Sequence, residues 1–197
     1  EIKWITSLKK LEKYPSIFLA NEFFDSIPIK QFLKDKDNWF ERFVYLSKNK
    51  NSKFINKKVN IKNIERKVNF KISNKQNFIE YSPLGLEYLK NIFNFIKKNN
   101  GGLLIIDYGY FDEKMRDTLQ AIYRKKYSRV LENIGNSDIT YHINFCFIKK
   151  IAKNLKELNI KFTTQKKFLT NLGIHQRAEI IGKNKTFSEK SDIFYRL

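Results

Sequence analysis

The amino-acid sequence predicts an α/β fold built around a parallel sheet. Two apolar runs, residues 17–20 and 103–106, each end in an acid or amide and are typical of buried strands in such a sheet. A helical pattern over residues 83–98 leads directly into the second run. Because helices connect parallel strands, we predict that strands 17–21 and 103–108 are parallel neighbours, with this helix in a right-handed crossover between them.

Between the first strand and the helix, the chain is predicted to leave the parallel layer. Residues 29–33 and 39–46 are rich in aromatic and β-branched side chains, which indicates strands. Residues 48–76 are dominated by Lys, Asn and Ser, and this composition favours an exposed, weakly paired hairpin or a long loop. We therefore expect residues 29–80 to form an antiparallel β insertion.

The helix before the second strand has clear start and stop signals. Ser82 suits its N-cap and Pro83 its first position. Asn99, Asn100 and the two following glycines stop it. Apolar residues recur between these limits at helical spacing, at positions 86, 89, 92, 93 and 96.

The remaining third of the chain is predicted to be mostly helical. Residues 118–123 fit a strand or a helix equally well, whereas the pattern over 144–158 is that of an amphipathic helix. Residues 161–164 favour a short strand, and two helices are expected over 165–172 and 174–182. The sequence shows no internal repeat and no sign of a separate second domain.

Composition excludes several classes of protein. With 197 residues and 42% hydrophobic side chains, the chain can bury a core and is not a disordered tail. The lone Cys146 excludes a disulfide framework and a cysteine zinc site, and it is expected to be a small core residue. Two histidines make a histidine-rich metal site unfavourable, and no metal is predicted. The sequence has no apolar run of the roughly 18 residues that a membrane span needs.

The net charge of +19 raises nucleic acid as a possible partner. Of the 39 basic residues, 32 are Lys and only seven are Arg, and the Lys residues are scattered along the chain. Phosphate-binding surfaces favour clustered Lys and Arg, so a solvated Lys-rich surface explains the charge better. A basic nucleic-acid-binding domain stays an alternative.

Polar groups follow both predicted parallel strands at the edge where ligands bind in α/β sheets. Asn21 and Glu22 end the first strand, with Asp25 close behind, and Asp107 and Tyr108 end the second. On adjacent strands these ends would face one cleft. The alternative is that they only cap the following segments in solvent.

A second group of polar side chains lies on residues 138–145, which alternate strictly between polar and apolar. In an extended segment Asp138, Thr140, His142 and Asn144 would point to one side. This pattern fits a functional site. It fits equally an edge strand with a solvent-exposed face, in which His142 is structural and Asn144 caps the next helix. No GxSxG, GxGxxG or phosphate-loop motif occurs.

Five segments, in order along the chain, resemble motifs of one known family. ANEFFDSIP at 20–28 resembles ANEFFDALP, and IIDYGY at 105–110 matches the family's own motif. DTLQA at 117–121 and DITYHINF at 138–145 are similar to DTLQA and DLTAHVNF, and residues 164–179 resemble TQGxFLxxLGI followed by RAE. The chain is thus similar to the MidA-like methyltransferases. These are protein arginine methyltransferases that act as mitochondrial complex I assembly factors, with bacterial relatives.

The resemblance implies a class I methyltransferase fold, a Rossmann-like three-layer sandwich. It implies S-adenosylmethionine (SAM) as cofactor and methyl transfer to an arginine guanidinium, with a complex I subunit as the protein substrate. The family's glycine-rich SAM loop precedes the ANEFFD motif and a last strand follows the RAE motif, and residues 1–197 contain neither. Lys166 also replaces the Gly of TQG. We therefore expect residues 1–197 to be the C-terminal two-thirds of one such domain, truncated at both ends and with little turnover alone.

The resemblance also assigns roles to individual residues. Glu22 and Asp25 lie on the loop where other arginine methyltransferases place two acids, so these two residues and His142 are the expected catalytic residues. Asn21 and Phe23 are expected to bind the cofactor. Substrate-binding roles are expected at four further positions: Asp107, Tyr108, Asp138 and Thr140.

The place of action depends on the source. We expect the cytoplasm for a bacterial protein and the mitochondrion for a eukaryotic one, and no targeting segment is visible in the sequence. A non-catalytic assembly or binding module that docks on a complex I subunit is the main alternative function.

Overall fold

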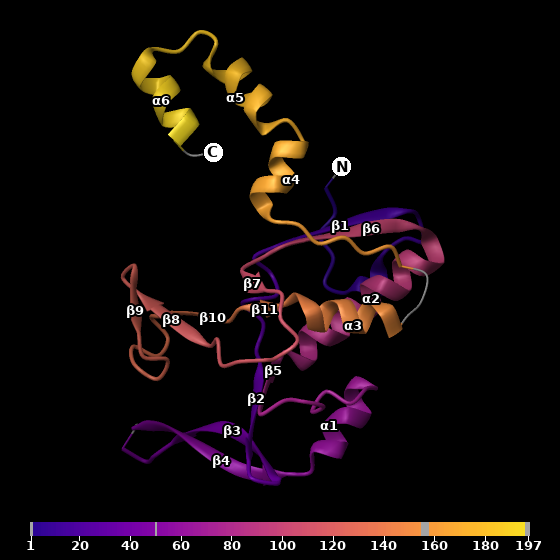
Figure 1. The fold of residues 1–197 in the computed structure, drawn as a ribbon, viewed down its shortest axis with the longest axis vertical. Coiled ribbons are helices and arrows are strands. Elements are labelled where there is room, and N and C mark those ends of the chain that lie inside the picture. Colours follow the sequence, from indigo (N-terminus) through magenta and orange to yellow (C-terminus); the bar gives the residue numbers. More distant parts are fainter. Residues whose placement is uncertain (1, 50, 155–157, 196–197) are drawn as a thin grey trace. The chain divides into compact units, whose positions relative to one another are not determined.

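A computed structural model describes residues 2–49, 51–154 and 158–195 of the chain. These residues fall into two compact units, residues 1–158 and 159–197 (Figure 1). The first unit holds every strand and the long helices, and the second holds three short helices. The assignment of residues 1–197 to a single domain stays a prediction.

The parallel pair predicted from the two apolar runs is present. Strand β1 (Ser16–Asn21) pairs in parallel with β6 (Gly101–Ile106), from Ser16 opposite Gly101 to Asn21 opposite Ile106. Helix α2 (Pro83–Asn99) precedes β6 and begins as expected, because the Ser82 side chain accepts a hydrogen bond from the Gly85 amide. The helix packs on the pair through Phe18, whose ring meets that of Phe95 edge-on at 5.4 Å.

The expectation that β1 is buried on both faces is wrong for the described residues. Ala20 lies in the core, but Ile17 and Leu19 on the opposite face are 86% and 67% exposed. Helix α2 covers one face of the strand, and side chains alternate between the faces of a strand. The apolar run therefore does form a strand, but no element of the described residues covers its second face.

The insertion expected over residues 29–80 is present as a four-stranded antiparallel sheet. Its strands are β2 (Lys30–Asp35), β3 (Asn38–Leu46), β4 (Ser52–Val59) and β5 (Phe78–Tyr81), in the order β4-β3-β2-β5. Figure 1 shows β3 and β4 extending from it as a long hairpin.

The expectation of an exposed, weakly paired hairpin or a long loop over residues 48–76 is right in part: β4 is largely exposed and forms an antiparallel hairpin with β3, but that hairpin is regularly paired and a helix follows it. Strand β4 pairs with β3 along its whole length, from Ser52 opposite Leu46 to Val59 opposite Trp39. Helix α1 (Ile61–Val68) follows, with Asn60 accepting a hydrogen bond at its N-cap and Asn69 in the left-handed conformation at its C-cap. Within β4 and α1 the Lys residues lie on the solvent side, and Asn60 and Asn69 cap α1.

Beyond β6 the chain adds short strands and a helix. Strand β7 (Gly109–Tyr110) pairs in parallel with β11 (Ile143–Asn144), and β8 (Gln120–Tyr123) lies between β9 (Lys126–Ser128) and β10 (Asp138–Thr140). Residues 120–123 are thus a strand, which settles the helix-or-strand alternative. Helix α3 (Phe145–Asn154) confirms the amphipathic prediction up to 154, and the expected continuation through 155–157 lies outside the described residues.

The second unit contains helices α4 (Gln165–Asn171), α5 (Ile174–Gly182) and α6 (Phe187–Tyr195). The first two confirm the predicted helices, and Thr164 caps α4 by accepting a hydrogen bond from the Lys167 amide. The strand expected over 161–164 is wrong, because these residues pair with no strand among the described ones and lead directly into α4. A short 3-10 helix, η1 (Leu8–Lys10), precedes β1 in the first unit. Among the described residues, no helix is long and apolar enough to cross a membrane.

Candidate functional site

The two predicted strand ends meet at one edge of the parallel pair. Asn21 and Ile106 lie opposite each other as the last residues of β1 and β6. One residue further on, the Glu22 amide donates to the Ile106 carbonyl at 2.9 Å. The carboxyl ends of the two strands therefore open onto a shared edge, as the sequence predicted.

Residues 22–25 form a tight loop at this edge. Glu22 is exposed and has a φ of 44°, in the left-handed region that side chains disfavour. One carboxylate oxygen of Asp107, Oδ2, accepts hydrogen bonds from the amides of Phe24 at 3.1 Å and Asp25 at 3.3 Å. The other oxygen, Oδ1, accepts from the Tyr108 amide at 2.9 Å. The residue that ends β6 thus holds the loop that follows β1.

The loop concentrates negative charge. The pKa of Asp25, which is 6% exposed, is raised first by burial and then by the charges of Glu22 and Asp138. Burial, followed by the charge of Asp25, raises the pKa of Asp107 to about 6. These four carboxylates repel one another, and a bound cation would relieve that repulsion.

The segment 138–145 is not one extended strand, so the expected common face for its four polar side chains is wrong. It divides into β10 and β11, which belong to different sheets, and Tyr141 between them is buried. The Tyr141 amide donates to the Asp25 carbonyl at 3.2 Å, which ties this segment to the acidic loop. Asn144 is buried and its Oδ1 accepts from the Phe147 amide at 3.0 Å. This contact confirms the alternative in which Asn144 caps the next helix.

The other residues of this segment lie apart from one another. Asp138 is exposed and close enough to raise the pKa of Asp25. Thr140 Oγ1 accepts from Gln120 Nε2 at 3.1 Å, within the small sheet of β8 and β10. His142 is half-buried, and its amide donates to Thr118 Oγ1 at 2.9 Å. The structure thus joins Asp138 electrostatically to Asp25, whereas the described contacts of Thr140 and His142 are with neighbouring elements.

The residues expected to bind a cofactor lie at the exposed side of the same edge. Asn21 is the exposed last residue of β1. Phe23 is 40% exposed, and its ring meets the rings of Phe24 and Tyr88 edge-on at 5.1 and 5.4 Å. Tyr108 is also exposed. An aromatic ring held by two others offers a firm apolar surface to a ligand.

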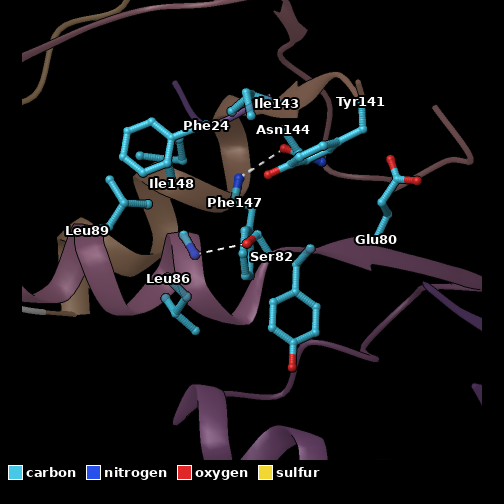
Figure 2. A pocket seen from close by; sticks show the side chains of 12 residues that line it. Phe24, Glu80, Ser82, Leu86, Leu89, Tyr141, Ile143, Asn144, Phe147 and Ile148 are labelled. Atoms are coloured by element: carbon cyan, nitrogen blue, oxygen red, sulfur yellow. Dashed lines mark hydrogen bonds between the residues drawn. The ribbon is translucent and has the colours of Figure 1, made fainter. Parts of the chain in front are cut away.

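A small cavity lies beneath the loop, between helices α2 and α3 (Figure 2). Its volume of about 30 Å³ has room for one or two water molecules and is far too small for a cofactor or a peptide side chain. It belongs to the core, and neither Glu22 nor Asp25 lines it. Its lining is mostly apolar and includes Phe24, Leu86, Leu89, Tyr141, Ile143 and Ile148.

A buried polar network centred on Glu80 was not predicted from the sequence. This residue, 5% exposed on β5, accepts hydrogen bonds from Gln31 Nε2 at 2.6 Å and from the Thr118 hydroxyl. Arg42 Nη1 donates to Asp117 Oδ2 at 2.6 Å and to Gln31 Oε1 at 2.9 Å. Burial raises the pKa of Glu80. The one sign of this network in the sequence is that the acidic Glu80 lies between apolar residues of β5.

This network joins the insertion to the backbone of His142. Thr118 lies between them, since its hydroxyl donates to Glu80 and accepts from the His142 amide. Gln31 Nε2 also donates to Asp117 at 2.8 Å, so the residue before Thr118 is held as well. The insertion sheet therefore fixes the segment that leads into β11.

Among the described residues, no group of three or more His, Cys, Asp or Glu side chains is arranged so that it could hold a metal ion. Cys146 lies part-buried on α3, and burial raises the pKa of its thiol, which disfavours the thiolate. What the edge offers chemically is its carboxylates, whose negative charge attracts positively charged groups.

Comparison with known proteins places these features in a family. Residues 1–164 match the family model described as "Putative S-adenosyl-L-methionine-dependent methyltransferase". Among curated proteins, the chain is 26% identical over 180 residues to "Protein arginine methyltransferase NDUFAF7, mitochondrial" of Mus musculus. It is 28% identical over 178 residues to the Caenorhabditis elegans homolog. These matches cover 91% and 89% of the chain, and 41% and 42% of the relatives.

Two crystal structures from Burkholderia thailandensis share the fold. One, a "likely methyl transferase" bound to S-adenosyl-homocysteine, aligns with a TM-score of 0.74 at 18% identity. A native structure from the same superfamily and organism aligns with a TM-score of 0.75 at 18% identity. Each alignment covers 97% of this chain, and 51% and 52% of the neighbours. The chain has the class I methyltransferase fold and spans about half the length of these neighbours and about two fifths that of the curated relatives.

Proposed function

Because the chain belongs to the family of SAM-dependent methyltransferases whose model matches residues 1–164, we propose that the protein transfers a methyl group from SAM to an arginine of a protein substrate. The observation that carries this proposal is the pair of acids, Glu22 and Asp25, at the shared carboxyl edge of β1 and β6. In a chain of net charge +19, this edge gathers four carboxylates. It is suited to a cation, and arginine is the acceptor named in the curated relatives.

The acids would hold the guanidinium. This group is planar and permanently charged, and carboxylates match it through paired hydrogen bonds. Exposed Glu22 would make the first contact, and Asp25 below it would add a second acceptor. Two carboxylates draw positive charge towards the nitrogens that they bind, which leaves the remaining nitrogen more nucleophilic. Bound SAM would supply an electrophilic methyl group.

The remaining predicted residues would complete the acceptor side. Asp138, whose charge is felt at Asp25, would lie along the path of the incoming arginine. His142, on the segment held by Thr118, would orient the substrate or accept the released proton. Tyr108, exposed beside the loop, would contact the substrate. Thr140 is the weakest of these assignments, because its hydroxyl is bonded to Gln120.

The described residues fit a SAM site in part. Asn21 and Phe23 are exposed at the edge where a cofactor binds in this type of sheet and would form one wall. Two glycines serve strand packing, since a Cβ at Gly101 would lie 1.9 Å from the Ser16 carbonyl and one at Gly109 would lie 2.3 Å from the Ile143 carbonyl. No glycine-rich turn follows either β1 or β6. We therefore expect a polypeptide of residues 1–197 to bind SAM weakly.

The substrate and place of action extend this proposal. A respiratory complex I subunit is the substrate that the sequence resemblance implies, and the curated relatives carry "mitochondrial" in their names. We propose mitochondrial action for a eukaryotic source and cytoplasmic action for a bacterial one.

Label transfer tests the proposed function. The full-length protein is incubated with SAM carrying a radioactive methyl group and a library of arginine-containing peptides, and the labelled residue is identified by mass spectrometry. We expect label on arginine and none on the same peptides with lysine in its place. SAM binding without any transfer would instead favour a non-catalytic binding module.

A further inference from the structure

The conformation of the acidic loop needs support from outside the loop. Glu22 adopts a φ of 44°, which L-residues other than Asn and Asp rarely adopt. A loop with such a residue keeps one conformation only when surrounding contacts fix it. The direction of the Glu22 and Asp25 side chains therefore depends on whatever holds the backbone of residues 22–25.

The support comes mainly from one side chain, Asp107. It accepts three hydrogen bonds, all from backbone amides: those of Phe24 and Asp25 at Oδ2, and that of Tyr108 at Oδ1. Two backbone contacts from other elements add to this support, from the Glu22 amide to the Ile106 carbonyl and from the Tyr141 amide to the Asp25 carbonyl. Within the turn itself, the Ser26 hydroxyl donates to the Phe23 carbonyl and the Ile27 amide to the Phe24 carbonyl. Asp107 is thus the side chain that links the end of β6 to the loop after β1.

The same contacts disfavour a direct role for Asp107 in binding substrate. A carboxylate accepts about four hydrogen bonds, and three of these positions are used by the backbone. A guanidinium that binds through paired hydrogen bonds needs two oxygens with free positions facing the same way. Glu22 is exposed and better placed for this contact.

We propose that Asp107 is a positioning residue: its carboxylate fixes the backbone of Phe24 and Asp25 and thereby aims Glu22 and Asp25 at the cation. The fixing of the loop backbone by Asp107 does not depend on what the protein does, whereas its consequence for catalysis rests on the proposed function. Asp107 is half-buried next to Asp25; burial and the charge of Asp25 raise its pKa to about 6, and the amides that bind its carboxylate act in the opposite direction.

Amide hydrogen exchange in the full-length protein tests the positioning directly. Asp107→Ala removes both acceptor oxygens and with them all three hydrogen bonds, whereas Asp107→Asn keeps one oxygen. We expect the amides of Phe24 and Asp25 to exchange roughly tenfold to a hundredfold faster in the Ala variant, with the Asn variant between it and wild type. Asp112→Asn is the matched control, because Asp112 accepts one amide bond from Lys114 in an exposed loop.

The core amides of α2 serve as an internal reference for this measurement. If Asp107→Ala accelerates them as well, the variant is globally destabilised and the Asn variant decides the outcome. Unchanged exchange at Phe24 and Asp25 in both variants would overturn the proposal.

Steady-state kinetics then separates positioning from direct contact. A displaced loop should lower kcat and raise KM for an arginine peptide, together about tenfold or more in kcat/KM, with SAM affinity unchanged. A raised KM with normal amide exchange would mean that Asp107 contacts the substrate and would overturn the proposal. Absence of methyl transfer by the wild-type protein would count against the proposed function alone, because amide exchange still reports on the loop.

Discussion

Replacing Glu22 by Gln in the full-length protein removes one negative charge from the acidic loop and changes little else. The side chain is exposed and its backbone contact to Ile106 does not involve the carboxylate, so we expect the melting temperature to stay the same. The removed charge should weaken the contact with the substrate guanidinium. A hydrogen bond between charged groups contributes about 1.5–3 kcal/mol, which corresponds to roughly tenfold to a hundredfold in rate. Misplacement of the acceptor nitrogen adds to this loss.

The assay compares methyl transfer, SAM affinity and thermal stability in the same variants. We expect Glu22→Gln to lower kcat/KM for an arginine peptide by about a hundredfold while calorimetry finds SAM affinity unchanged. Glu87→Gln is the matched control, since Glu87 is an exposed acid on α2 outside the loop and its loss removes the same charge. The control should transfer methyl groups at the wild-type rate.

Three results would refute this reasoning about Glu22. Unchanged methyl transfer in Glu22→Gln would remove the residue from the site. A weaker affinity for SAM would move it to the cofactor side. An equal loss in the Glu87 control would mean that overall charge, and not the loop, determines the rate.

Three further changes test other parts of the structure. Asp25→Asn should lower kcat/KM by about tenfold, less than Glu22→Gln, and should leave stability unchanged or slightly higher because repulsion is removed; a drop in melting temperature would contradict this. Methyl transfer should fall as the pH falls through about 6, where Asp107 takes up a proton, and a pH–rate profile without a step near 6 would count against it. The contribution of Asp107 to the free energy of unfolding changes in the opposite sense, since a pKa raised in the folded state favours folding as the pH falls; the melting-temperature difference between wild type and Asp107→Asn measures this. Gly101→Ala should destabilise the first unit by about 2–5 kcal/mol in urea unfolding, because Gly101 has a φ of 125° and the new Cβ would lie 1.9 Å from the Ser16 carbonyl. In Gly102→Ala the new Cβ would meet nothing within 4 Å, so the free energy of unfolding should fall by less than about 1 kcal/mol. Equal losses of stability in the two variants would contradict the packing argument.

The parallel pair and its helix could be predicted from the sequence because local and long-range signals agree there. The Ser82 cap, the helical spacing after it and the apolar run before Asp107 all indicate the same αβ unit, which the structure contains. The shared carboxyl edge of the two strands could be predicted from this pairing, since parallel strands end on the same side. The sequence shows acids at the ends of both strands. Once the two strands pair in parallel, these acids must lie close together.

Features that depend on partners distant in sequence could not be predicted. The composition of β4 indicates a loop, and only its ladder with β3 makes it a strand. The alternation over 138–145 indicates one strand, but β10 and β11 pair with different neighbours and divide it. The Glu80 network depends on Gln31 and Thr118, which lie 49 and 38 residues away along the chain. Such contacts arise from tertiary packing and leave no local pattern.

The proposed function requires Glu22 and Asp25 to hold a guanidinium at the carboxyl edge of β1 and β6. Calorimetric titration of the full-length protein with an arginine peptide and its citrulline counterpart, in the presence of S-adenosyl-homocysteine, tests it most directly. Citrulline keeps the shape of arginine and lacks its charge. We expect the arginine peptide to bind at least about tenfold more tightly than the citrulline peptide, and we expect this preference to be lost when Glu22 and Asp25 are replaced by Gln and Asn. Equal affinity for the two peptides, or a preference that survives both replacements, would contradict it.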